Sequence, residues 1–210
     1  MTFKEVVNSR RAINFFDPEK SVSKEDLKSI LEMAAKAPSS FNLQPWSVMV
    51  IDGKEDKETL RKLAWNQPKI TEAPLTLIVL ADQDGWKEGH PFVEKNFQEM
   101  IKSGTMQEAQ REWFKGAREG LYGSTPQRKL AFAVKNAAFF AMTLMLAAKS
   151  LGIETHPMDG FDMDKVKQAF KIPDTYWIPL LIAVGYFKKG ETLMPAKWRK
   201  SPEELIVRFD

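Results

Sequence analysis

Apolar residues recur at helical spacing in the first part of the chain. Residues 3–9 predict a short helix that runs into two arginines. A second helix is predicted by apolar residues three and four positions apart: Leu27, Ile30, Leu31 and Ala34. Ser23, with Asp26 three residues later, resembles a capping box at the start of this helix, and Pro38 marks where it must have ended.

Three short apolar runs rich in β-branched residues have the pattern of buried strands. They span residues 48–51, 75–81 and 178–184. Because these runs are almost continuously apolar, we expect strands that are covered on both faces. Pro179 is expected at the very start of its strand, where a missing N–H is tolerated.

Two long helices are predicted between the last two runs, over residues 92–118 and 126–151. The second has Thr125 as its N-cap, Pro126 in its first turn and Gly152 beyond its end. From 137 to 148 it is apolar almost all round, so we expect it to be buried on every side. A single domain of 210 residues has limited room for such a helix. A dimer core is favoured, and the central helix of a monomer is the alternative.

The composition excludes some classes of function but does not identify one. The 210 residues suit one domain, 1–210, and 43% of them are hydrophobic. The net charge is +3 with both signs interspersed, which disfavours a nucleic-acid partner. No run of 18 apolar residues and no signal peptide is recognised, so we expect a cytoplasmic protein without a membrane partner. The absence of cysteine excludes thiolate chemistry and disulfides, and two histidines are too few for a histidine-rich metal centre.

Conventional catalytic motifs are missing from the sequence. There is no G-x-S-x-G elbow, no P-loop, no H-E-x-x-H and no glycine-rich dinucleotide fingerprint. Hydrolysis by a catalytic triad is therefore disfavoured, and no metal is expected.

The run A-P-S-S-F-N-L-Q-P-W, residues 37–46, combines polar side chains with a stiff backbone. Serine, asparagine and glutamine side chains both donate and accept hydrogen bonds, which suits the edge of a heterocycle. The two prolines restrict their own φ and the residues before them. The alternative is a rigid turn without a binding role.

Basic residues occur in pairs at distant places in the chain. Arg10 and Arg11 follow the first helix, and Lys197 and Arg199 lie in the C-terminal tail. Each pair alone is explained by a charged helix end or a basic terminus. Together, three basic groups from these distant parts of the chain could converge on a dianionic phosphate, because arginine binds phosphate through two parallel hydrogen bonds.

These segments, in this order, resemble the nitroreductase family of flavin enzymes, which are homodimers that bind FMN at the subunit interface. The resemblance runs from S-R-R-A-I-N at 9–14 through A-P-S-S-x-N-x-Q-P-W, N-x-x-K at 66–69 and P-M-D-G at 157–160 to K-x-R at 197–199. It implies an α+β fold with three layers, α/β/α, around a central, mostly antiparallel sheet. It also implies an intertwined homodimer whose tail, from about 190–210, extends onto the partner.

The resemblance further implies a set of cofactor-binding residues: Arg10, Arg11, Ala12, Asn14, Pro38, Ser39, Ser40, Asn42, Gln44, Asn66, Lys69, Pro157, Met158, Asp159, Gly160, Lys197 and Arg199. The basic residues at both ends of the chain would hold the FMN phosphate, and Asn66 and Lys69 would contact the pyrimidine edge. Residues 38–42 would come from the other subunit. Backbone N–H groups of Asp159 or Gly160 would reach N5.

The implied activity is an FMN-dependent NAD(P)H oxidoreductase with ping-pong hydride transfer. NADH or NADPH would be the reductant, and the acceptor would be a small molecule: a nitroaromatic, a quinone or another flavin. No side-chain acid or base stands out; Lys69 would act electrostatically on the reduced ring. Position 14 is usually basic in this family and is Asn14 here, which places more of that stabilisation on Lys69.

Two alternatives remain at this point. One is a flavin-binding sensor or store without efficient turnover, and the other is a specialised branch such as a reductive dehalogenase or dihydropteridine reductase. Four aromatic residues are candidates for an acceptor channel, with ordinary packing as the alternative for them: Phe41, Trp113, Phe114 and Tyr122.

Overall fold

A five-stranded sheet forms the centre of the molecule in the computed structural model, which describes residues 1–209. Its order is β1-β2-β5-β3, with β4 beside β2, and each pairing between these strands is antiparallel. The strands are β1 Trp46–Ile51, β2 Leu75–Asp82, β3 Glu154–Met158, β4 Tyr176–Trp177 and β5 Leu181–Gly185.

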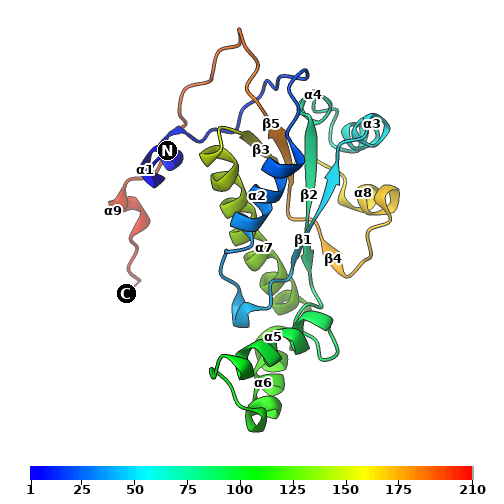
Figure 1. Ribbon diagram of the computed structural model, residues 1–210, viewed down its shortest axis with the longest axis vertical. Coiled ribbons are helices and arrows are strands. Elements are labelled where there is room, and N and C mark those ends of the chain that lie inside the picture. The colour runs from blue at the N-terminus through cyan, green and yellow to red at the C-terminus, as the bar shows by residue number, and fades with distance from the viewer. Residues whose placement is uncertain (210) are drawn as a thin grey trace.

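Helices cover both faces of this sheet (Figure 1). On one side lie α2 (Lys24–Ala34) and α7 (Pro126–Ser150); on the other lie α3 (Lys54–Leu63), α4 (Lys69–Glu72) and α8 (Met163–Phe170). Each side has its own apolar core, because residues of β2 alternate between them: Leu77 and Val79 pack in one core, Ile78 and Leu80 in the other. The predicted α+β fold with a central antiparallel sheet is confirmed.

The prediction that the strands are covered on both faces is confirmed for the inner strands and was wrong for the edge strand β1. β2 and β5 are buried almost throughout, as their continuous apolar sequence predicts. β1, an edge strand that pairs with β2 alone, is only partly buried within this chain, so the prediction of cover on both faces was wrong there. The third run was also predicted too long, because β5 begins at Leu181 and Pro179 lies before it.

The predicted helix 92–118 is two helices. α5 spans Pro91–Lys102 and α6 spans Arg111–Arg118. The chain turns between them at Gly104, whose φ of 74° is a left-handed conformation that glycine adopts without strain. A short 3₁₀ turn, Glu108–Gln110, then leads into α6. A π-helical turn, Glu119–Gly123, follows α6.

Capping follows the sequence at both predicted N-termini. Ser23 Oγ accepts a hydrogen bond from the Asp26 N–H at 2.9 Å, and Thr125 Oγ1 accepts one from the Arg128 N–H at 3.2 Å. The first helix, α1, spans Phe3–Ser9 as predicted.

α7 is the long core helix, although it is not buried on every side within one chain. Phe139 and Met142 are 45% and 43% exposed. By length and composition alone α7 is long and apolar enough to cross a membrane, and half of its most apolar stretch is buried inside this fold. Its exposed side is an apolar stripe on the surface of the chain.

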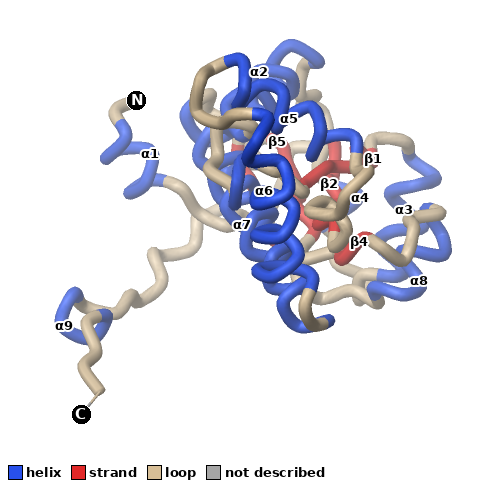
Figure 2. Tube along the Cα trace, turned by 90° about the horizontal axis from the view of Figure 1, so that it is seen from below, coloured by secondary structure: helices blue, strands red, loops and turns tan. Residues whose placement is uncertain are grey.

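Both termini extend away from the helices and the sheet (Figure 2). The C-terminal tail leaves β5 and ends in a short helix, α9 (Pro202–Leu205). Along this tail large apolar side chains are exposed: Leu193, Met194, Trp198, Leu205, Ile206 and Val207.

Candidate functional site

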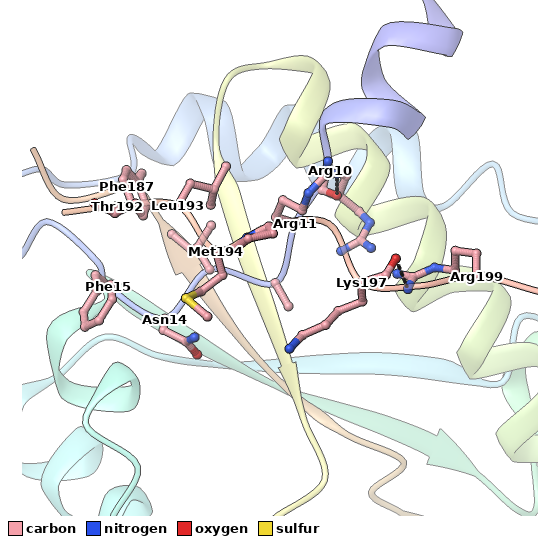
Figure 3. Close-up of a pocket in the computed structure, with 13 residues that line it drawn as sticks. Arg10, Arg11, Asn14, Phe15, Phe187, Thr192, Leu193, Met194, Lys197 and Arg199 are labelled. Atoms are coloured by element: carbon pink, nitrogen blue, oxygen red, sulfur yellow. Dashed lines mark hydrogen bonds between the residues drawn. The ribbon is translucent and has the colours of Figure 1, made fainter.

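Cations from both ends of the chain meet beside the sheet. A cavity of about 180 Å³ is lined by Arg10, Arg11 and Asn14 from the segment after α1, and by Lys197 and Arg199 from the tail. Figure 3 shows these side chains around the segment that leads from α1 to the sheet. The structure thus brings the two basic pairs together, and their binding of a phosphate stays a prediction.

The cluster is electrostatically unbalanced. Burial lowers the pKa of Arg10, and the positive charges of Arg199 and then Arg11 lower it further, while Glu154 acts in the opposite direction. Between residues 1 and 209 no salt bridge joins Arg10, Lys197 or Arg199 to a carboxylate. Cations held together without a partner favour binding of an anion.

Arg11 behaves differently from its neighbour. Its guanidinium donates to the carbonyl of Asn8 at 2.7 Å, at the end of α1, and to the carbonyl of Arg10 at 2.9 Å. It therefore completes the C-terminus of α1, as the helix-end alternative expected. Of the two arginines, Arg10 is the one left to bind an external group.

The segment that carries Arg10 and Asn14 is fixed against the edge strand β3. Ala12 forms a parallel bridge with Thr155, and the Ile13 N–H donates to the Thr155 carbonyl at 3.4 Å. His156 adds a side-chain hydrogen bond, since its Nδ1 lies 2.6 Å from the Ile13 carbonyl oxygen. β3 was not predicted as a strand; Pro157 lies in it without loss because an edge strand does not need every N–H.

The segments around Asn66 and Gly160, both assigned to the cofactor by the resemblance, also meet. Gln67 Nε2 donates to the Gly160 carbonyl at 2.9 Å, and Lys69 Nζ donates to Gln67 Oε1 at 3.4 Å. Trp65 lies over Gly160 so closely that a Cβ there would be 2.7 Å from the indole ring. Burial lowers the pKa of Lys69, and the carboxylate of Glu72 opposes that shift.

The run 37–46 is held by two asparagines as well as by its prolines. Ser40 N–H donates to Asn136 Oδ1 of α7 at 3.0 Å. Asn96 of α5 donates to the Phe41 carbonyl at 2.7 Å and accepts from Asn42 Nδ2 at 3.0 Å. Both asparagines are buried.

These contacts stabilise an unusual backbone in the run. Phe41, Asn42 and Gln44 have φ values of 49°, 55° and 47°, which cost energy for residues other than glycine. The Ser39 hydroxyl also accepts from the Gln44 N–H at 3.0 Å, which closes the turn. The run is therefore held by hydrogen bonds in addition to the restriction from its prolines.

Within one chain this loop lies far from the cation cluster. The cluster borders Met142 and Leu146 of α7, whereas the loop is bound to Asn136. Six residues separate Asn136 from Met142 and ten separate it from Leu146, which is about 9 to 15 Å along a helix axis. The two parts of the predicted site therefore lie at different levels of the same helix.

The four candidate channel aromatics form one cluster. Phe41 meets Trp113, Phe114 and Tyr122 edge to face, with ring centroids 6.3, 5.3 and 6.3 Å apart. Phe114 is buried and stacks on Phe97, which fits the packing alternative, whereas Trp113 is 58% exposed. Burial raises the pKa of Tyr122. The acceptor channel itself stays a prediction.

Sequence reasoning missed three residues that organise the site: Asn96, Asn136 and His156. A polar residue in the apolar pattern was the available signal for Asn136, since it interrupts a buried helix. In the part of the chain that the structure describes, no group of three or more histidine or acidic side chains is arranged so that it could hold a metal ion.

The sequence matches the Nitroreductase family over residues 7–186, which is most of the chain. The chain belongs to this family. The predicted kinship and the predicted class of enzyme, a nitroreductase-family NAD(P)H:FMN oxidoreductase, are confirmed.

Relatives of this nitroreductase-family protein agree with that assignment. The NAD(P)H nitroreductase YdgI of Bacillus subtilis is 31% identical over 186 residues, covering 87% of each chain. The nitroreductase ydfN of the same organism superposes with a TM-score of 0.89 at 28% identity, covering 99% of this chain and 98% of that one. A nitroreductase of Exiguobacterium sibiricum in complex with FMN has a TM-score of 0.78 at 30% identity, covering 95% and 98%. All three are named as "putative" enzymes.

Proposed function

We propose that this nitroreductase-family protein is a homodimeric, FMN-dependent oxidoreductase that takes hydride from NADH or NADPH and passes it to a nitroaromatic, quinone or flavin-type acceptor. The observation that carries the proposal is the cluster of Arg10, Lys197 and Arg199, which lies beside the sheet without a carboxylate partner among residues 1–209. A phosphate dianion is the partner that such a set of donors suits.

The chain's own residues divide the binding of FMN between them. Arg10, Lys197 and Arg199 would hold the phosphate. Asn66 and Lys69 would contact the pyrimidine edge, next to Gly160, to which Gln67 is hydrogen-bonded. The segment 157–160 and the residues 65–69 form one wall, joined by the hydrogen bond from Gln67 to Gly160 and by the packing of Trp65 on Gly160, and this wall would lie beside the ring.

FMN would supply the hydride chemistry, in two half-reactions that share one site. The protein's part is to orient the ring and to stabilise the negative charge that reduction adds. Lys69 is the cation on the ring side, and its burial strengthens its interaction with a charge placed next to it. No side-chain acid or base is assigned; Asn14 is uncharged.

A second copy of the chain would complete the site. The loop 38–42 is held on α7 about 9 to 15 Å of helix axis away from the cation cluster, so it is suited to a partner's cofactor. The apolar stripe at Phe139 and Met142 and the apolar tail residues would be buried by the same partner. The tail from about 190 onward would extend onto it.

Purification decides the proposal. The protein should come from cells yellow, with an absorption band near 450 nm that NADH or NADPH bleaches without oxygen. Adding a quinone or a nitroaromatic should restore the band. A protein that stays colourless after incubation with FMN would overturn the proposal, and one that binds FMN but is not reduced would identify a flavin sensor or store.

A further inference from the structure

His156 lies midway along β3, between the two ends of the proposed cofactor site. Glu154, two residues before it, is close enough to Arg10 to influence its pKa. Met158 and Gly160, after it, lead to the wall formed with Trp65 and Gln67. A ligand that spans from the Arg10 cluster to Lys69 therefore passes the level of His156.

The hydrogen bond to Ile13 determines the tautomer of His156. A carbonyl oxygen only accepts, so Nδ1 at 2.6 Å must carry the proton and donate it. The neutral imidazole then leaves Nε2 without a proton. Protonation at Nε2 creates a cation while the bond to Ile13 is kept.

The surroundings of His156 disfavour its charged form, and a negative charge placed nearby would favour it. Burial and the ammonium of Lys69 on α4 lower its pKa, and the hydrogen bond to Ile13 opposes them. On its own strand, Glu154 is paired with Lys149 of α7, and Arg10 beyond it is a permanent cation. Asn14, on the segment next to Ile13, carries no charge.

We infer that His156 is the proton-accepting group of this site: it takes up one proton from solvent at Nε2 when the bound flavin is reduced. The inference rests on the proposed function. Hydride transfer leaves NAD(P)⁺ and adds one negative charge to the ring, and the proton on His156 balances that charge. Among the groups named around it, only an imidazole changes its charge between pH 5 and 8 without a large perturbation.

His156 thus acts as a positioning residue with two functions. Its Nδ1–H fixes the segment 10–14 against β3 at all times. Its Nε2 responds to the redox state of the site and supplements Lys69. A permanent cation at position 14 would also balance this charge, but Asn14 is uncharged.

The direct test is NMR titration of the imidazoles in the FMN-loaded protein, oxidised and then reduced with dithionite. The chain has only two histidines, so His90, hydrogen-bonded to Asp82 at 3.1 Å, is an internal reference. We expect the His156 titration midpoint to rise by at least one pH unit, a tenfold change in proton affinity, on reduction. Equal midpoints in both redox states would overturn the inference.

Variants separate the proton from the positioning. His156→Gln keeps a donor for Ile13 but cannot gain a charge, and His156→Val removes both. In the wild type the flavin midpoint potential should fall with pH more steeply between the His156 pKa of the oxidised protein and that of the reduced protein, by about 30 mV per pH unit, the equivalent of one proton taken up with two electrons. His156→Gln should lose this extra slope and keep its FMN; an unchanged slope would overturn the inference.

The outcomes also distinguish this inference from the proposed function. A wild type that holds FMN and is bleached by NAD(P)H, but whose His156 does not shift, defeats only the inference. A wild type that does not hold FMN defeats the proposed function. If His156→Val fails to fold, the Gln variant and the wild-type titration still decide.

Discussion

Lys69 is a half-buried cation whose own carboxylate neighbour, Glu72, only partly offsets the cost of its burial. A negative charge beside it should therefore be strongly favoured. We predict that Lys69→Ala lowers the midpoint potential of the bound flavin by about 30 mV or more, a tenfold change in the redox equilibrium. Spectroelectrochemistry measures it, with Lys28→Ala, an exposed lysine on α2, as the matched control. An unshifted potential would refute the charge argument for Lys69.

Asn136 satisfies the Ser40 N–H with its oxygen and the Phe132 carbonyl with its nitrogen, while fully buried. Asn136→Ala should lower the free energy of unfolding by about 1–3 kcal/mol, because it leaves a polar group without a partner. Urea unfolding measures the loss. The exposed amide Gln98, replaced by alanine, should change stability by less than about 0.5 kcal/mol. A similar loss in both variants would contradict the assigned role of Asn136.

His156 also predicts a pH dependence of stability. Its folded-state pKa lies below 6.5, because burial and Lys69 disfavour the cation. Between that pKa and 6.5 the unfolded chain binds a proton that the folded chain does not, so the stability present above pH 6.5 is lost as the pH falls through this window. Thermal unfolding of the apoprotein should show this loss in the wild type and a smaller one in His156→Gln. Parallel curves would contradict it.

At the scale of elements, the predictable strands and helices were those whose sequence signals lie within one continuous segment of the chain. β2 was predicted because it is apolar on both faces, and α7 because its cap, proline and glycine lie at its ends. The helix over 92–118 was predicted as one because the whole stretch is amphipathic and charged, and Gly104 marks the break. β3 was not predicted because Pro157 and His156 do not have strand character. These residues form a strand only through their pairing with β5.

For the candidate site, the sequence indicated the residues that would contact a ligand but not the residues that support them. The residues that would touch a ligand carry a recognisable order, whereas Asn96 and Asn136 act by holding the loop from two other helices. Such support depends on distances that only the folded chain establishes. The same holds for Arg11, which lines the cavity but whose guanidinium is hydrogen-bonded to the Asn8 carbonyl at the end of α1.

One glycine in a strand and one in a helix have different surroundings, so we expect replacement by alanine to have opposite effects on stability. In Gly185 of β5 an added Cβ would lie 2.4 Å from Pro74 Cδ, so Gly185→Ala should cost about 1–3 kcal/mol of stability. Gly116 in α6 has open space around it, and Gly116→Ala should add about 0.5–1 kcal/mol. Denaturant unfolding of the two variants measures both. Equal signs would show that one of these two surroundings is not as described.

At the scale of the molecule, the tail must reach the cluster for the phosphate to be held. Replacing both Lys197 and Arg199 by alanine should lower the affinity for FMN at least tenfold, because charge-assisted contacts to a dianion are each worth more than 1 kcal/mol. Fluorescence titration of the apoprotein with FMN measures this. A double alanine variant at Lys188 and Lys189, before the tail, is the control. Equal FMN affinity in both variants would overturn the phosphate role.

The spacing along α7 has a consequence for mixtures of subunits. If each site takes its cations from one chain and its loop from the other, a tail variant and a loop variant such as Ser40→Phe are damaged in different halves. A heterodimer of the two then has one site with both defects and one with neither. Randomly reassembled from two inactive preparations, the mixture should regain about a quarter of the wild-type sites. Inactive proteins would thus restore each other, which a site built within one chain does not permit.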